Sequence, residues 1–578
     1  MARAIQLRAL SVSMAFAAAL MACAPYGPGP GRGEGAAAAQ PPAAKKSINV
    51  AVTTTDPAIF RASAGGPFGG SVPGVDALED LVNAGATIRD DKDVLRPQLA
   101  ESTPTLDNGL WKLHPDGRME TTWRIKPNAK WQDGAPFTAA DLVFTLKISM
   151  DPDMVAFGGH VGFEIIESVE AADARTITVR WKRPFIEADT LFTTKFAMPM
   201  PPHLLERAYT ENREGFIDLP YWNREFVGTG PFKLRDWLEG SHLVLAAFDD
   251  YVLGRPKIDE VVVKFVPDPN TLVANLLAAE VDINLGRGVS LEQGIQLRDQ
   301  WREGKMDVGF INWVVMYPQF INPNPPIIGG DPRFRKALMH SIDRQEMADT
   351  LQSGLTPVAH AIIDTSLPQY RELDRFVVRY SFDPRRAGQL LEALGYVRGP
   401  DGGFRDSSGQ RLVVEIRTTG EQDIQVKSLL SVADYWQKAG VGVDTQLIPR
   451  QRQRDREYRA SRPGFELLRT PNMQQGLRRA HSSETPLPEN NFGKSGNNAR
   501  YMNPEFDALL DRYFSTIPQR ERLQVLAQIV QHHTDVVTVM GLFFAAEPAL
   551  ISNRLHNAAA RKVQESTTAW NAHEWELR

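Results

Sequence analysis

The sequence has almost no cysteine: Cys23 is the only one among 578 residues. A lone cysteine cannot form an intramolecular disulfide, and it supplies no Cys-x-x-Cys pair for a metal or redox site. The chain also lacks an excess of basic charge, with 65 Lys and Arg against 70 Asp and Glu, a net charge of -5. Nucleic acid and anionic membranes attract a basic face, so we expect neither a nucleic-acid partner nor electrostatic membrane binding.

Catalytic signatures are missing as well. The sequence contains no Gly-x-Ser-x-Gly and no His-Glu-x-x-His motif. Gly493-Lys494-Ser495 ends like a phosphate loop, but Pro488 stands where the first glycine belongs. His532 and His533 would project about 100° apart on a helix, so they do not converge on one metal ion. We therefore expect no catalytic residue, no metal and no cofactor.

A continuous run of apolar or small residues lies at the N-terminus, after the basic residues Arg3 and Arg8. The run from Ala9 to Ala22 falls short of the roughly 20 residues that span a bilayer, but it suits an export signal. It ends in Leu20-Met21-Ala22-Cys23, which resembles the bacterial lipobox. This resemblance implies cleavage before Cys23 and a lipid on its sulfur, with an ordinary secretory signal as the alternative.

After Cys23 the chain is rich in Gly, Pro and Ala up to about residue 46, a composition that cannot bury a core. We interpret this stretch as a tether. The rest is long enough for roughly two to four domains. Runs of β-branched residues such as INVAVTT, TITVRW, EVVVKFV and RLVVEIRTT predict strands. They alternate with periodic helices, which predicts a mixed α/β fold.

Helix starts are well marked. Thr138 and Asp141 have capping-box spacing, and Asp331-Pro332 and Asp383-Pro384 each place an N-cap aspartate before a first-turn proline. Gly395 follows the second of these helices as a stop signal, and another helix begins at Pro504.

Several sequence blocks resemble the extracellular solute-binding proteins of family 5, which include oligopeptide-, dipeptide- and nickel-binding proteins of ABC importers. Their order along the chain matches the family's. The blocks are Arg96–Ser102, Glu120–Lys126, Lys130–Gly134 with Phe137–Phe144, Val227–Leu234, Gly254–Val261, Arg333–Arg344 and Tyr501–Asp507. Within them Asp133-Gly134 predicts a tight turn, and Trp131 is expected in the core.

The resemblance implies a periplasmic-binding-protein type II (class C) fold with two lobes and an extra domain inserted in the first. The expected divisions are a signal peptide (1–22), the lipidated tether (23–46), lobe I (47–70, 185–303 and 540–578), the inserted domain (71–184) and lobe II (304–539). It also implies that a hinge closes on a peptide or other small polar solute between the lobes. An ABC permease with its ATPase subunits would then receive the solute from a lipid-anchored monomer on the periplasmic or outer face of a bacterial membrane.

The ligand is less well defined. Peptide-binding members of the family carry an Asp for the ligand's amine after a late strand, and here Arg469 stands in that place. An arginine favours a ligand with a carboxylate or polar oxygens, unless it pairs with an acidic neighbour in the lobe. By position we also expect ligand contacts from Asp56, Phe60, Tyr221, Trp222, Asn312, Trp313, Tyr317, Thr470 and Asn472.

Two alternatives stay open. A surface hydrolase would need a catalytic constellation that only folding brings together. A solute sensor without a transporter would share the fold and the cleft.

Overall fold

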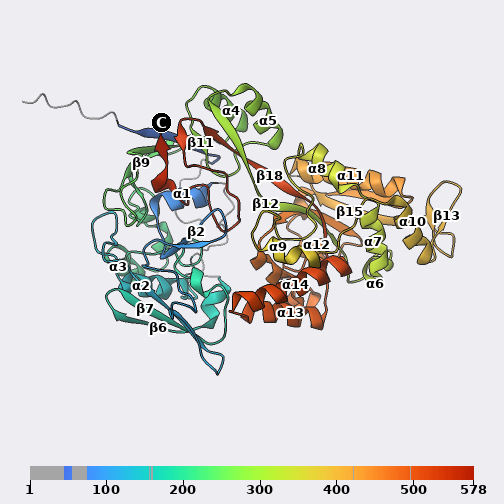
Figure 1. Cartoon of the computed structure of the whole chain (residues 1–578), viewed down its shortest axis with the longest axis horizontal. Helices are drawn as coiled ribbons and strands as arrows, with labels where there is room; N and C mark the ends of the chain where they lie inside the picture. Colours follow the sequence, from blue (N-terminus) through green and yellow to red (C-terminus); the bar gives the residue numbers. More distant parts are fainter. Residues whose placement is uncertain (1–44, 55–73, 155–156, 158–159, 421, 495) are drawn as a thin grey trace, which may run out of the picture. The chain divides into compact units, whose positions relative to one another are not determined.

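A computed structural model describes residues 45–54, 74–154, 157, 160–420, 422–494 and 496–578 (Figure 1). The predicted signal, Cys23 and the tether up to residue 44 lie outside the described residues, as do Asp56 and Phe60. Within the described ranges, every helix is too short or too polar to cross a membrane.

The main sheet shows how the chain is organised, because its strand order does not follow the sequence. Ten strands are hydrogen-bonded side by side. In spatial order they are β16 (Gly442–Ile448), β15 (Val413–Thr419), β17 (Phe465–Pro471), β12 (Gly304–Pro318), β18 (Met540–Ser552), β11 (Ile283–Asn284), β1 (Ser47–Val52), β10 (Glu260–Phe265), β9 (His242–Ala247) and β8 (Phe232–Leu238).

Two long antiparallel strands at the centre join the halves of this sheet. β12 has 15 residues and β18 has 13, and they pair from Gly304–Ser552 to Met316–Met540. β11 pairs with β18 near the C-terminal end of β18, at Ile551. β17 pairs with β12 over residues 312–318, at the C-terminal end of β12. We call the half with β11, β1, β10, β9 and β8 lobe I, and the half with β16, β15 and β17 lobe II.

A second sheet of four strands has its own core. Its order is β4 (Trp111–Leu113), β5 (Met119–Arg124), β7 (Thr176–Trp181) and β6 (Ile166–Asp173). Trp123, Trp131 and Trp181 are fully buried in the cluster beneath it. The indole of Trp131 donates to Asp141 Oδ1 at 2.9 Å, and Asp141 and Thr138 complete the predicted capping box of α2 (Ala139–Ser149).

The other predicted helix starts are confirmed. The side chains of Asp331, Asp383 and Asn503 accept hydrogen bonds from backbone N–H groups of α7 (Pro332–His340), α10 (Pro384–Ala393) and α13 (Pro504–Ser515). Gly395 follows α10 with a φ of 88°, a left-handed conformation that glycine adopts without steric cost. These caps depend on local sequence alone, which is why they could be predicted.

Several further helices pack on the main sheet or beside it. Lobe II packs α11 (Asp423–Lys438) against β15 and β16, with Trp436 buried in its core. The other helices of eight or more residues are α1 (Val75–Val82), α3 (Pro202–Glu211), α4 (Pro269–Leu277), α5 (Leu291–Gln300), α8 (Arg344–Leu351) and α14 (Gln519–Val536). Short helical turns include α6 (Ile327–Gly330), α9 (Tyr370–Leu373), α12 (Arg456–Ala460) and the 3-10 helix η8 (Gln474–Ala480).

Candidate functional site

Two adjoining cavities are lined by segments that are distant in the sequence. Their volumes are about 200 and 230 Å³. Five residues line both: Arg89, Glu187, Met473, Gln475 and Glu565. Arg89 and Glu187 belong to segments next to the core of the four-stranded sheet, and Glu565 lies in the C-terminal segment that packs on lobe I. Met473 and Gln475 come from lobe II, directly after β17, so these cavities form an interlobe site.

The basic groups of the interlobe site already have protein partners. Arg89 donates to the backbone oxygen of Asp93 at 3.0 Å and lies 3.4 Å from its carboxylate. Lys562 pairs with Asp307 at 2.7 Å. Lys195 donates to the backbone oxygens of Gln564 and Ser566 at 3.0 and 3.2 Å. These cations therefore hold the walls of the site together.

The acid Glu187 of the interlobe site is poorly compensated. Glu187 is 8% exposed, and its Oε1 has no hydrogen-bond partner among the described residues. Its Oε2 lies 3.8 Å from His160 Nε2, too far for a hydrogen bond. Burial raises the pKa of the Glu187 carboxyl to about 7. By contrast, buried Asp80 accepts hydrogen bonds from Thr194 and Thr567, and burial raises its pKa to about 6.

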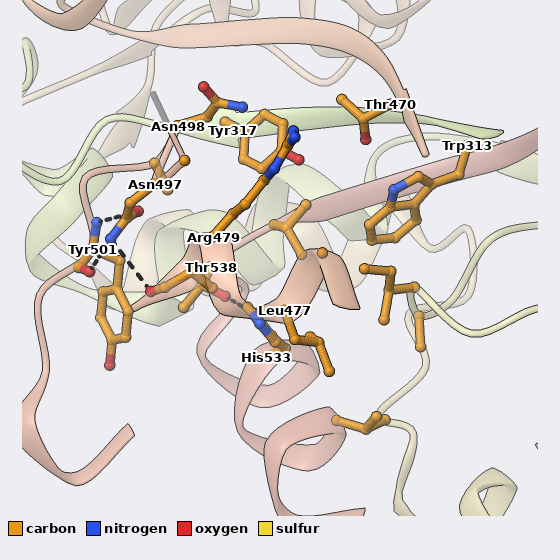
Figure 2. A pocket seen from close by; sticks show the side chains of 18 of the residues that line it. Trp313, Tyr317, Thr470, Leu477, Arg479, Asn497, Asn498, Tyr501, His533 and Thr538 are labelled. Carbon is orange, nitrogen blue, oxygen red and sulfur yellow. Dashed lines mark hydrogen bonds between the residues drawn. The ribbon is translucent and has the colours of Figure 1, made fainter. Parts of the chain in front are cut away.

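A third cavity lies within lobe II (Figure 2). Met473 lines both this cavity and the interlobe site. The cavity has a volume of about 100 Å³, and we call it the lobe II pocket. Its apolar wall includes Trp313, Tyr317, Leu477, Tyr501 and Phe506, and Figure 2 shows Arg479 beside Tyr317. Such a mixture of aromatic and polar side chains is typical of small-molecule sites.

The polar atoms of the lobe II pocket differ in how well they are satisfied. His533 Nδ1 is hydrogen-bonded to Thr538, and burial lowers the His533 pKa to about 3, so this imidazole is neutral. Asn497 donates to the backbone oxygen of Tyr501 at 2.7 Å. Trp313 is 3% exposed, and its Nε1 has no hydrogen-bond partner within the described part of the chain. The Trp313 N–H is thus a buried donor that the described part of the chain leaves unpaired.

The structure brings some of the predicted ligand contacts together. Trp313, Tyr317 and Thr470 line the lobe II pocket, and Asn472 lines the interlobe site while its amide donates to the Phe310 backbone oxygen at 3.0 Å. Asn312 lies on β12 beside Trp313, but its amide donates to Glu547 at 3.0 Å.

Three other predicted contacts have different surroundings. Arg469 forms an ion pair with Glu547 on β18, so its charge is compensated within the protein. Tyr221 and Trp222 lie in the core of lobe I. The Tyr221 hydroxyl donates to the Val227 backbone oxygen at 2.9 Å, and the Trp222 indole donates to that of Phe216 at 2.8 Å. Neither lines the interlobe site or the lobe II pocket.

Sequence reasoning missed Glu187, Met473 and Glu565. Glu187 follows Phe185-Ile186, and an acid within an apolar segment could have been noticed as a candidate. Met473 directly follows Asn472, which was predicted. Glu565 lies in a segment without any motif. Among the described residues, no three His, Cys, Asp or Glu side chains are grouped so that they could hold a metal ion.

Comparisons with known proteins agree with this architecture. The oligopeptide-binding protein AppA of Bacillus subtilis is 24% identical over 375 residues, and the match spans 64% of this chain and 64% of AppA, less than two thirds of that relative. Heme-binding protein A of Haemophilus influenzae is 25% identical over 475 residues, 76% of this chain and 77% of that protein.

Solved structures show the same fold. A periplasmic EDTA-binding protein, EppA, superposes with a TM-score of 0.72 at 16% identity, covering 92% of this chain and 97% of EppA. NikZ from Campylobacter jejuni, solved in complex with Ni(L-His), has a TM-score of 0.66 at 20% identity, covering 92% of this chain and 99% of NikZ. The predicted two-lobed type II fold is therefore confirmed.

A family model described as "Bacterial extracellular solute-binding proteins, family 5 Middle" matches residues 94–475. This match covers more than half of the 578 residues. The chain belongs to the family 5 bacterial extracellular solute-binding proteins.

Proposed function

We propose that this protein is the lipid-anchored substrate-binding component of an ABC importer. It captures a peptide or another small polar solute between its lobes and delivers it to a membrane permease, without making or breaking a bond. The function depends on binding energy alone. A solute that binds the closed arrangement more tightly than the open one shifts the hinge equilibrium toward closure.

The single observation that carries this proposal is the connection between the lobes. β12 and β18 are the strands that join the two halves of the main sheet, and the interlobe site is lined from both halves. A rotation about the crossing strands would therefore change the size of the site. Family membership supports the same role, since this family consists of solute-binding proteins.

The anchor rests on the lipobox-like segment before Cys23, which lies outside the described residues. A diacylated cysteine would hold the protein at the outer face of a bacterial membrane, and the Gly- and Pro-rich tether would give the lobes freedom to reach a permease.

Native mass spectrometry of the full chain, purified without refolding, tests the proposal. We expect a bound solute of defined mass that leaves on unfolding and raises the melting temperature when added back, because ligand that binds only the folded state stabilises it. Conversion of that solute into a product of different mass would instead indicate an enzyme.

A further inference from the structure

Glu187 is a poorly compensated acid of the interlobe site. Glu187 Oε1 has no hydrogen-bond partner among the described residues, and with the residue only 8% exposed, bulk water does not replace that partner. A buried polar atom without a partner costs free energy, so a donor on a bound molecule that paired with it would be stabilised there. Glu187 lines both interlobe cavities, so its side chain lies at the wall that a bound molecule would contact.

The surroundings do not neutralise the carboxylate. His160 faces Glu187 at 3.8 Å, but its Nδ1 accepts a hydrogen bond from the Gly162 backbone and its ring stacks on Phe196 at a centroid distance of 3.5 Å. Burial lowers the His160 pKa to about 4, so this ring carries no charge at neutral pH. His160 therefore supplies neither a hydrogen bond nor a counter-charge to Glu187.

The charged groups farther from Glu187 are of both signs. Arg478 and Arg89 favour its ionised form, whereas Glu565 and Asp189 oppose it. Arg478 lies over the Phe514 ring at 4.0 Å, and Arg89 is paired with Asp93. Neither arginine forms an ion pair with Glu187 within the described chain. The carboxylate is thus available to a cation that comes with the solute.

We propose that Glu187 accepts a hydrogen bond from a cationic amino group of the bound solute, with Glu565 as the second acidic group of that subsite. This inference rests on the proposed function and adds the chemical class of the ligand. An ammonium group supplies three donors and a positive charge, and a charge-assisted hydrogen bond is about twice as strong as a neutral one.

The lobe II pocket adjoins the interlobe site at Met473, so the rest of the solute would extend from Glu187 toward that pocket. Met473 lines the interlobe site and also the lobe II pocket, whose lining includes Trp313 with its N–H unpaired among the described residues. Methionine is flexible and adapts to different neighbours. The arrangement suits an amine that carries an extended, partly apolar body with hydrogen-bond acceptors, as a short peptide with a free N-terminus does.

Capture from a defined peptide mixture tests this inference. The probe is a tryptic digest of casein, half of it N-acetylated on all amines with a heavy-isotope label, incubated with the full chain. Mass spectrometry of the retained peptides gives the ratio of free to acetylated forms. We expect the wild type to enrich the free form at least tenfold over the input, and Glu187→Gln to lose most of that enrichment.

Glu206→Gln is the matched control, because Glu206 is exposed on α3 and is not among the residues that line the interlobe site. The substitution removes the same kind of charge outside the site. It should enrich free amines as the wild type does. Equal retention of free and acetylated peptides, or unchanged enrichment by Glu187→Gln, overturns the inference while leaving solute binding intact. Retention of no peptide of either form, by a protein that native mass spectrometry shows to be empty, contradicts the proposed function as well.

Discussion

The guanidinium of Arg469 on β17 pairs with the carboxylate of Glu547 on β18, 78 positions further along the chain. Asn312 on β12, which lies between these strands in the sheet, donates to the same carboxylate at 3.0 Å. The three side chains tie the joining strands β12 and β18 to lobe II. The sequence left open whether Arg469 meets a ligand or an acidic neighbour, and the structure contains the acidic neighbour.

Replacement of Arg469 by alanine should therefore reduce stability more than binding. Removing one partner of a buried ion pair leaves the other charge uncompensated, at a cost of about 3 kcal/mol. Chemical denaturation of the two proteins measures this loss. The double variant Arg469→Ala, Glu547→Gln should regain part of it, because no charge remains unpaired. Full stability of the single variant together with lost solute binding would instead make Arg469 a ligand contact.

Glu187→Gln should change how stability depends on pH. The folded-state pKa of about 7 lies above the ordinary value of 4.5, so the folded state holds a proton more tightly than the unfolded state between these values. Stability from this group is present below about pH 4.5 and is lost as the pH rises through 7. Glutamine does not titrate, so Glu187→Gln should not show this loss of stability over the same pH range.

Melting temperatures at pH 5 and pH 8 provide the test. Glutamine should stabilise the protein relative to wild type at pH 8, by roughly 3 kcal/mol at most, and much less at pH 5. The Glu206→Gln control should show no such pH-dependent difference. A difference between Glu187→Gln and wild type that is the same at both pH values would show that Glu187 is ionised throughout.

Trp313→Phe should weaken solute binding while the lobe II pocket keeps its shape. The substitution removes an indole N–H that has no protein partner among the described residues, and one hydrogen bond is worth up to about tenfold in affinity. Calorimetric titration with the solute released from the native protein measures the change. Trp436→Phe is the control: its indole donates to the Leu338 backbone oxygen in the lobe II core, so its loss should lower stability but not affinity. Unchanged affinity of Trp313→Phe would remove this N–H from the ligand site.

Cys23→Ser should abolish the lipid anchor. Membrane fractionation of cells expressing either form measures the result, and mass spectrometry of the mature N-terminus identifies the cleavage site. We expect the wild type in the membrane fraction with a diacylated cysteine, and the variant in the soluble fraction. A variant that fractionates with membranes as the wild type does would contradict the anchor.

The predictable features were those in which neighbouring residues determine the structure. The N-cap aspartates Asp331 and Asp383 act on backbone groups within their own helices, and a capping box spans only one turn. Trp131 could be assigned to the core because its sequence block resembled a known family. The order of the blocks was also enough to identify the fold.

The environment of a charge could not be predicted in this way. Arg469 finds its partner only because β17, β12 and β18 lie side by side in the folded sheet. Glu187 is a candidate ligand contact because it is buried and because one of its carboxylate oxygens has no donor among the described residues. Neither property has a sequence signature. Ligand chemistry depends on these long-range features, and for that reason the sequence indicated the family more clearly than the solute.

The central claim is that the two lobes close on a solute by rotation about β12 and β18. Small-angle scattering of the full chain, carrying Cys23→Ser to keep it in solution, tests this most directly. The measurement compares protein stripped of solute with protein reloaded with the solute that native mass spectrometry identifies. The account predicts a smaller radius of gyration for the loaded form, and an identical radius for both forms at saturating solute would contradict it.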